Sequence, residues 1–174
     1  TGAIADITDS AINGSQADSL AIVLGATSDI SDAVITGTSG SQDANYSITL
    51  DGFDSTLTIA QNALINSATG TNTVTLADAG TATGNAAVET YVLAAGTNAF
   101  TLGADGQNVT LDSTGNSGNV TINTGSITTV TGTFDDNSGN DTIDLLINTN
   151  ATTISSANTT DVDAIQLASN VSAT

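Results

Sequence analysis

The sequence contains no Lys, Arg or His, so no side chain carries a positive charge. Its 18 acidic side chains, 17 Asp and Glu89, give a formal net charge of −18 at pH 7. No side-chain salt bridge can form, and this charge must be balanced from solution, either by diffuse screening or by cations bound through oxygen ligands. Proteins hold nucleic acids and anionic membrane surfaces mainly through Lys and Arg, so we expect neither as a direct partner.

Cys, Met and Pro are also absent. The lack of Cys excludes disulfides. General bases, covalent nucleophiles and oxyanion-binding groups are usually His, Cys, Lys or Arg, so the sequence predicts a protein that is not an enzyme. No apolar run approaches the length of about 18 residues that a membrane span needs, so we expect no membrane insertion. Because position 1 is Thr and no Met occurs, we expect a processed mature chain or a fragment of a larger protein, and the absence of trypsin sites suits secretion to the extracellular surface.

Short β-prone runs follow one another along residues 1–174, which we expect to form a single domain. Each run is rich in Val, Ile, Thr or Leu and is bounded by Gly, Asn, Asp or Ser. The expected strands are residues 20–24, 33–36, 46–50, 56–59, 73–76, 90–93, 100–102, 108–111, 119–122, 128–134, 142–147 and 164–167. Helical patterns are weak and are limited to residues 58–68 and 160–169.

Internal repeats decide between two all-β architectures. "DITDSAING" begins at Asp6, "DISDAVITG" at Asp29 and "DGFDSTLTI" at Asp51, so the starting positions advance by a nearly constant step. Two further pairs of similar segments begin at Thr69 and Asn137 and at positions 87 and 161, and each spacing would correspond to three coils of roughly 22–25 residues. The sequence therefore favours a parallel β-solenoid with short strands and Gly, Asn and Asp corners. The alternative is a β-sandwich, which would need longer strands and more hairpin turns than the single Asn-Gly provides.

Acidic turns near the C-terminus are the candidate metal site. The richest group of oxygen ligands is Asp135, Asp136, Asn137, Asn140, Asp141 and Asp144. Ca²⁺ takes six to eight oxygens from carboxylates, amides and carbonyls, so this group predicts calcium as the cofactor. Asp161 and Asp163 are further candidate metal ligands from adjacent turns, although capping or simple exposure is favoured for them. For the Asp pairs at 6/9, 29/32 and 51/54, Asx-turn and capping roles are favoured over metal binding.

One segment carries a family resemblance. "SGNDTIDLL", residues 138–146, resembles the calcium-binding nonapeptide of RTX proteins, Gly-Gly-x-Gly-x-Asp-x-aliphatic-x. In this resemblance Gly139 is the last glycine, Asp141 a ligand and Ile143 the buried aliphatic residue, whereas Asp136 and Asn137 stand where the family has its leading glycines. "VETYVLAAGTN" and "VDAIQLASN" are similar in style to repeats of secreted bacterial surface-layer proteins and RTX-type adhesins. The resemblance implies secretion, calcium-dependent folding and a structural or adhesive role.

These features predict a non-enzymatic extracellular structural subunit, such as a surface layer, filament or adhesin stalk, whose acidic turns bind calcium. The open ends of a solenoid need a cap or a neighbour, so we expect assembly with copies of the same chain. The alternative is a recognition module that binds a glycan, ice or a host surface through a flat Thr/Asn face containing rows such as Thr73/Thr75. A ligand-free, calcium-dependent assembly would distinguish the first role from the second.

Overall fold

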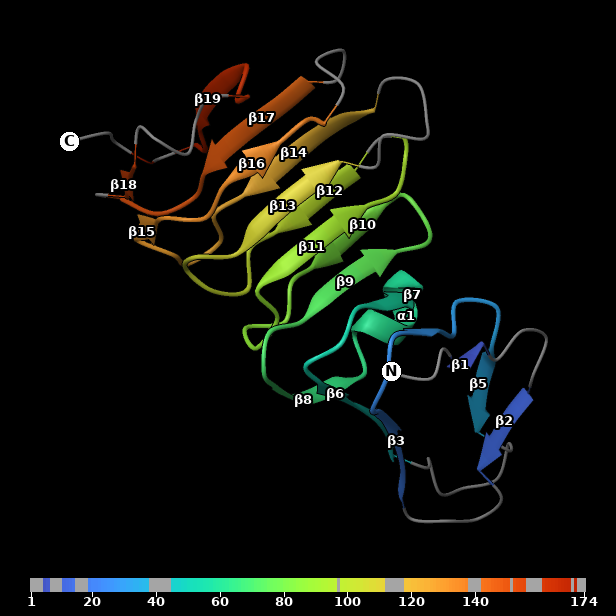
Figure 1. Cartoon of the computed structure of the whole chain (residues 1–174). Helices are drawn as coiled ribbons and strands as arrows, with labels where there is room; N and C mark the ends of the chain where they lie inside the picture. The colour runs from blue at the N-terminus through green and yellow to red at the C-terminus, as the bar shows by residue number, and fades with distance from the viewer. Residues whose placement is uncertain are drawn as a thin grey trace.

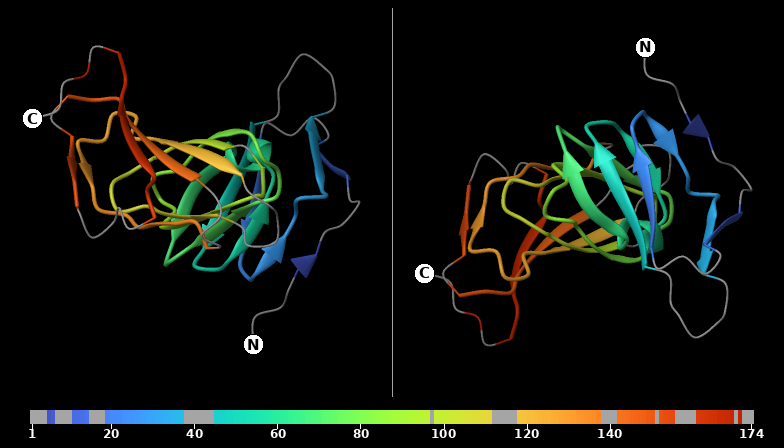
Figure 2. Two further views of the ribbon diagram at one scale, coloured as in Figure 1. Left: turned by 90° about the horizontal axis from the view of Figure 1, so that it is seen from above. Right: turned by 90° about the horizontal axis from the view of Figure 1, so that it is seen from below.

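The computed structural model is a parallel β-solenoid, as the sequence predicts. It describes residues 5–6, 11–14, 19–37, 45–96, 98–111, 118–137, 142–150, 152–155, 161–169 and 171, and the structural statements below concern these residues. Every strand pair in this part of the chain is parallel (Figure 1). A β-sandwich built from antiparallel hairpins is therefore excluded. Viewed from above and below, the coils partly overlie one another (Figure 2).

The first face of the solenoid is its longest sheet. Neighbouring strands in this sheet come from successive coils, so that Ala5 pairs with Ser28 and Ser28 pairs with Ser55. In order across the sheet, the strands are β1 (Ala5–Asp6), β4 (Ser28–Asp29), β7 (Ser55–Leu57), β9 (Thr73–Leu76), β11 (Thr90–Leu93), β13 (Asn108–Leu111) and β16 (Phe134–Asp135).

The second face follows the first in each coil and contains two sheets separated by one short helix. The elements, in chain order, are β2 (Ala11–Gly14), β5 (Val34–Gly37), α1 (Ile59–Asn62), β10 (Thr81–Thr83), β12 (Asn98–Thr101), β14 (Asn119–Asn123), β17 (Thr142–Ile147) and β19 (Ala164–Leu167). Side chains of α1 join the coils on either side of it. Gln61 Nε2 donates to the Ile30 carbonyl at 2.7 Å, and Asn62 Nδ2 donates to the Thr83 carbonyl at 2.9 Å.

The third face has strands near the two ends of the solenoid and turns in the middle. Its strands are β3 (Ser19–Leu24), β6 (Asn45–Asp51) and β8 (Ile65–Thr69) in one sheet, and β15 (Thr129–Val130) and β18 (Thr153–Ile154) in the other. Between these sheets the buried Gln107 links two turns. Its Nε2 donates to the Asn85 and Val88 carbonyls at 2.6 and 2.9 Å, and its Oε1 accepts from the Gly103 N–H at 2.7 Å.

Coil length varies along the solenoid with the elements that each coil forms. On the first face, long coils bring position 55 beside 28 and position 134 beside 109. Much shorter coils bring position 90 beside 73 and position 108 beside 90. In these two coils a turn stands in place of the third strand, whereas the coil that brings position 74 beside 55 is also short although it contains β8, and it has α1 in place of the second-face strand. The expected constant repeat is therefore wrong, although its first step is confirmed by the pairing of Asp6 with Asp29.

The other internal repeats do not stack in register. Asp29 pairs with Thr56 rather than with Asp51. The similar segments that begin at Thr69 and Asn137 lie on different faces, since Thr73 belongs to β9 on the first face and Thr142 belongs to β17 on the second. The same run of Thr and aliphatic residues between polar corners thus serves either face, and similarity alone does not identify equivalent positions.

Most expected strands are present, and the exceptions have local causes. The run at 56–59 ends at Leu57 because Thr58 caps α1, accepting from the Gln61 N–H while its own N–H donates to Gln61 Oε1. Residues 65–69 form β8 instead of extending the helix, and the helical pattern at 160–169 is wrong because β19 forms there. The run at 128–134 is divided into β15 and β16 by a corner at Gly132, where an added Cβ would overlap the Gln107 carbonyl oxygen.

The core consists of columns of alternating inward side chains, with each coil adding to every column. On the first face, one column contains Val74, Tyr91, Val109 and Phe134, and the next contains Leu57, Leu76, Leu93 and Leu111. On the second face, Ala82, Phe100, Ile122 and Leu145 form a column, and Phe100 contacts the Tyr91 ring across the interior at a centroid distance of 4.8 Å. Most outward residues between them are polar, with Val92 as an exception, which explains the alternating sequence pattern.

Candidate metal centre

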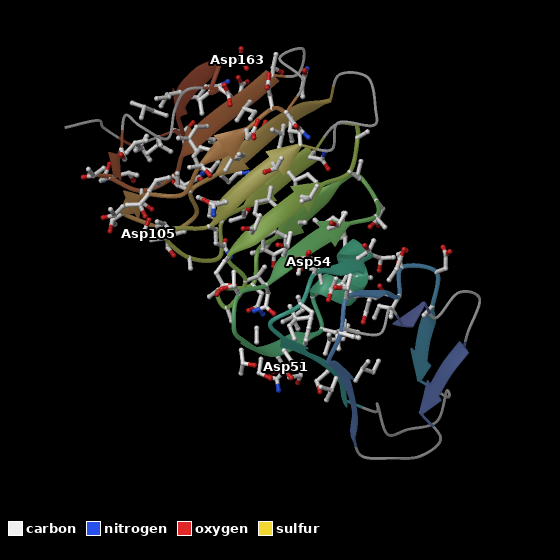
Figure 3. The ribbon with its side chains drawn as sticks, viewed as in Figure 1. Asp51, Asp54, Asp105 and Asp163 are labelled. Atoms are coloured by element: carbon white, nitrogen blue, oxygen red, sulfur yellow. The ribbon has the colours of Figure 1, made fainter. Side chains whose placement is uncertain are left out.

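Corner carboxylates commonly accept backbone N–H groups from a neighbouring coil. Asp78 Oδ1 accepts from the Ile59 N–H, and Asp105 Oδ1 accepts from the Thr131 N–H, each at 2.8 Å. Acidic residues lie along the length of the solenoid, as the labelled side chains in Figure 3 show. With no basic side chain available, these N–H groups supply positive partial charge to individual carboxylates, which is a structural role and requires no ion.

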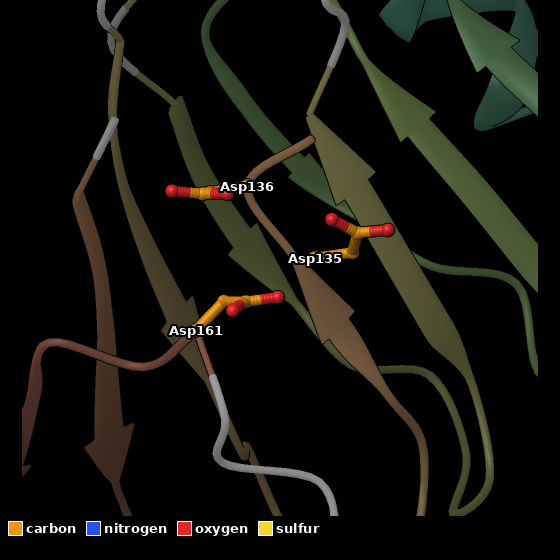
Figure 4. A group of neighbouring side chains, drawn as sticks. All are labelled: Asp135, Asp136 and Asp161. Atoms are coloured by element: carbon orange, nitrogen blue, oxygen red, sulfur yellow. The ribbon is translucent and has the colours of Figure 1, made fainter. Parts of the chain in front are cut away.

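Three carboxylates converge near the C-terminal end. Asp135 ends β16 and Asp136 follows it, while Asp161 lies one coil later, in the segment that leads to β19 (Figure 4). One carboxylate oxygen from each of the three lies within 4.8 Å of the other two. Asp135 is exposed, whereas Asp136 and Asp161 are half-buried. We refer to Asp135, Asp136 and Asp161 as the Asp triad.

The spacing of the Asp triad is compatible with one metal ion held through carboxylate oxygens. Calcium binds oxygens at about 2.3–2.6 Å, so two ligands on opposite sides of the ion can be about 5 Å apart. The mutual distances of up to 4.8 Å in the Asp triad fall within this limit. Asp135 Oδ1 already accepts from the Asn137 N–H at 2.7 Å, and its second oxygen can bind an ion while this contact persists.

Among the described residues, the other predicted ligands make contacts outside the Asp triad. Asn137 adopts the left-handed conformation with φ of 56°, and its Nδ2 donates to the Leu111 carbonyl at 3.4 Å. Asp144 Oδ2 accepts from Gln166 Nε2 at 2.9 Å, and Asp163 Oδ2 accepts from the Ile143 N–H at 2.8 Å. Asn140 and Asp141 lie outside the described residues, so the calcium ligand implied by the RTX resemblance is among the residues on which the structure is silent.

The earlier Asp pairs form local turns and contacts where they are described. Asp29 Oδ1 accepts from both the N–H and the hydroxyl of Ser31, at 3.0 and 2.7 Å, as in an Asx turn. Asp51 Oδ1 accepts from the Thr69 hydroxyl at 2.8 Å. The Asp29 contacts agree with the turn role favoured by the sequence, whereas the Asp51 contact joins two neighbouring coils.

The sequence pattern identified the three acids but not their grouping. This pattern grouped Asp161 with its near neighbour Asp163. In an extended segment, however, positions 161 and 163 lie opposite different residues of the preceding coil. Asp161 follows Asp135 at the same separation, 26 positions, as Thr131 follows Asp105, and the latter two residues form a direct contact between coils. The separation of one long coil was thus the sequence feature that could have placed Asp161 beside Asp135.

Comparison with known proteins adds no family assignment: no family model, curated protein or solved structure matches the chain. Within the described residues, no helix is long and apolar enough to cross a membrane.

Proposed function

We propose that the chain is a non-enzymatic structural subunit of an extracellular assembly, such as a surface layer, filament or adhesin stalk, and that Ca²⁺ at the Asp triad fastens its last coils together. The observation that carries this proposal is the convergence of three carboxylates from two coils in a chain with no basic side chain. Like charges on adjacent coils repel each other, and a divalent cation bound between them links the two coils instead.

The chemistry of the chain supports a structural role over a catalytic one. The described core is a stack of apolar columns, and buried amide side chains such as those of Gln61 and Gln107 hydrogen-bond to backbone groups. A chain free of Lys and Arg also offers trypsin-like proteases no site, which suits a protein exposed outside a cell. An assembly of such subunits would take its rigidity from the solenoid and its positive charge from the medium.

Calcium-dependent unfolding tests the proposal. The thermal midpoint should rise on addition of Ca²⁺ and fall again with excess chelator, because an ion that binds only the folded state stabilises it by mass action. At a free Ca²⁺ concentration 100 times the dissociation constant, the gain is about 2.7 kcal/mol. Asp161→Asn should remove most of this gain, since it takes away the only carboxylate that the later coil contributes to the Asp triad.

Asp78→Asn is the matched control. It removes the same charge from an exposed corner outside the Asp triad, and the amide oxygen can still accept from the Ile59 N–H. This variant should keep the full calcium response. A wild-type midpoint unaffected by Ca²⁺, or an equal calcium response in Asp161→Asn and wild type, would contradict the proposal.

A second candidate function rests on the outward surface of the first face. Thr and Asn side chains occupy register positions on successive coils there, in one column with Thr56, Thr75, Val92 and Thr110 and in another with Thr73, Thr90 and Asn108. Neighbours lie about 4.8 Å apart across the strands and about 6.6 Å apart along them, which makes a flat array of hydroxyls for a glycan or an ice surface. In this role a monomer should inhibit ice growth or bind immobilised glycan, and Thr110→Leu should abolish the effect.

A further inference from the structure

The apolar core is uncovered at the C-terminal end of the second face. β19 is the outermost strand there and pairs only with β17, which places Ile165 beside Leu145 and Leu167 beside Ile147. Leu145 and Ile147 are 0% and 5% exposed, whereas Ile165 and Leu167 are 53% and 47% exposed. The core columns therefore continue to the last coil and end without a covering layer among the described residues.

The surroundings of β19 form an incomplete coil. Ile154, Val162 and Val171 pack against the core beside it and are only partly buried. One edge of β19 bonds to β17, and the opposite edge has no strand beside it in the part of the chain that the structure describes. An edge strand with exposed aliphatic side chains is a template for another strand.

The geometry points to a second copy of this chain as the partner, joined head to tail by adding its β2 strand to β19. Among the described strands, β2 is the outermost at the opposite end of the same face and pairs only with β5. Its sequence, Ala11-Ile12-Asn13, repeats the Ala-Ile-amide order of Ala164-Ile165-Gln166. Aligning these triplets sets Ile12 beside Ile165 and preserves the parallel pairing used in every described coil.

This joint deepens the proposed function, on whose self-assembling role it rests, and it predicts the form of the assembly. A head-to-tail contact uses a different surface on each partner and leaves one of each open, so repetition builds a filament and not a closed dimer. Asp161 and Asp163 lie immediately before β19, and Asp6 lies in the first coil, so the joint also brings acidic segments together. We therefore expect assembly to be weak at low ionic strength and to strengthen with added salt or Ca²⁺.

Cysteine cross-linking tests both the partner and the register, because the natural chain has no Cys to interfere. Ile12→Cys and Ile165→Cys are prepared separately and mixed under mild oxidation. Residues that face each other on paired strands come within disulfide range, whereas residues separated by one more strand do not. The expected product is a mixed dimer that forms only in the mixture. Disulfide dimers of Ile165→Cys alone would show a tail-to-tail contact and overturn the head-to-tail joint.

Sedimentation velocity provides the second measurement. The wild-type chain should form elongated species whose size grows with concentration, and Leu167→Asp should weaken association at least about tenfold by placing a charge on the joint. Val92→Asp is the matched control, since it adds the same charge at an outward position in the middle of the first face, and it should assemble like wild type. Equal assembly by both variants, or a strictly monomeric wild type in Ca²⁺ and salt, would overturn the joint.

The calcium site and the head-to-tail joint can be refuted independently of each other. Leu167→Asp leaves the Asp triad intact, so its calcium-dependent thermal shift should equal that of wild type even where assembly is lost. A wild-type chain that shows this shift but forms no mixed Cys dimer retains the calcium site and refutes the joint. A chain that assembles fully in chelator and salt but shows no calcium-dependent thermal shift retains the joint and refutes the calcium site.

Discussion

Raising the pH should unfold the protein through a single buried phenol, Tyr91. This side chain is 0% exposed in the centre of the solenoid, where its hydroxyl donates to Asn62 Oδ1 at 3.0 Å and accepts from the Asn85 N–H at 2.7 Å. Burial raises the pKa of Tyr91 to about 12, and the hydrogen bond from the Asn85 N–H opposes the shift only in part. The folded state thus favours the neutral phenol.

The raised pKa fixes both the sign and the size of the effect. In the unfolded chain a Tyr ionises near its ordinary pKa of about 10. The contribution of neutral Tyr91 to stability is therefore complete below pH 10 and is lost as the pH rises towards 12. Two pKa units correspond to about 2.7 kcal/mol, at 1.36 kcal/mol per unit. The chain has no Lys, Arg or Cys, and its only other Tyr is Tyr46.

Urea unfolding at a series of pH values from 8 to 12 measures the effect, with tyrosinate absorbance reporting ionisation. Tyr91→Phe provides the control. It should be less stable by about 1–3 kcal/mol at neutral pH, because two buried polar groups lose their partner, and its stability should not fall above pH 10. A wild-type stability that stays constant to pH 12, or an equal alkaline loss in Tyr91→Phe, would refute the assignment.

Three further changes test the packing by urea-unfolding midpoints. Gln107→Leu should cost about 2–3 kcal/mol because two buried carbonyls lose their donor, and a neutral result would show that they find other partners. Asn72→Asp should cost about 2–3 kcal/mol, because the Asn72 amide donates to two carbonyls and a carboxylate in its place would face those carbonyls and Glu89. Acid should reduce this loss of stability, and a loss that persists at acid pH would contradict the charge argument. Gly132→Ala should cost about 3 kcal/mol, whereas Gly25→Ala, whose Cβ meets nothing within 4 Å, should be nearly neutral; equal costs would refute the close approach of coils at Gly132.

The fold class was predictable because the local pattern repeats in every coil. Runs such as Thr73–Leu76 and Asn108–Leu111 match their observed strands at both ends, since alternation and polar corners are encoded locally. Coil length was not predictable in the same way. It depends on which elements each coil forms: α1 replaces a strand in one short coil, and in others turns linked by the buried amide of Gln107 stand in place of the third strand. These differences are accompanied by contacts with neighbouring coils, distant in the sequence.

The candidate metal site was also predictable from the sequence only in part. Composition was sufficient to single out Asp135, Asp136 and Asp161 as oxygen ligands, but their convergence depends on the length of the intervening coil. The sequence also could not distinguish Asp161 from Asp163. The difference arises from strand register, which directs the Asp163 carboxylate to the Ile143 N–H of the preceding coil.

The acidity of the chain follows from how its corners are satisfied. An Asn or Asp oxygen at a corner can accept a backbone N–H from the neighbouring coil, as Asn72 does from Gly52 and Asn98 does from Gly80. An amide fills this position without charge, so each Asp used there adds a charge that local hydrogen bonding tolerates but does not neutralise. Separated by a coil or more, such charges are weakened by solvent and salt. At the Asp triad three of them meet within 4.8 Å, where screening is least effective, and a bound divalent cation is the physical remedy available to a sequence without Lys or Arg.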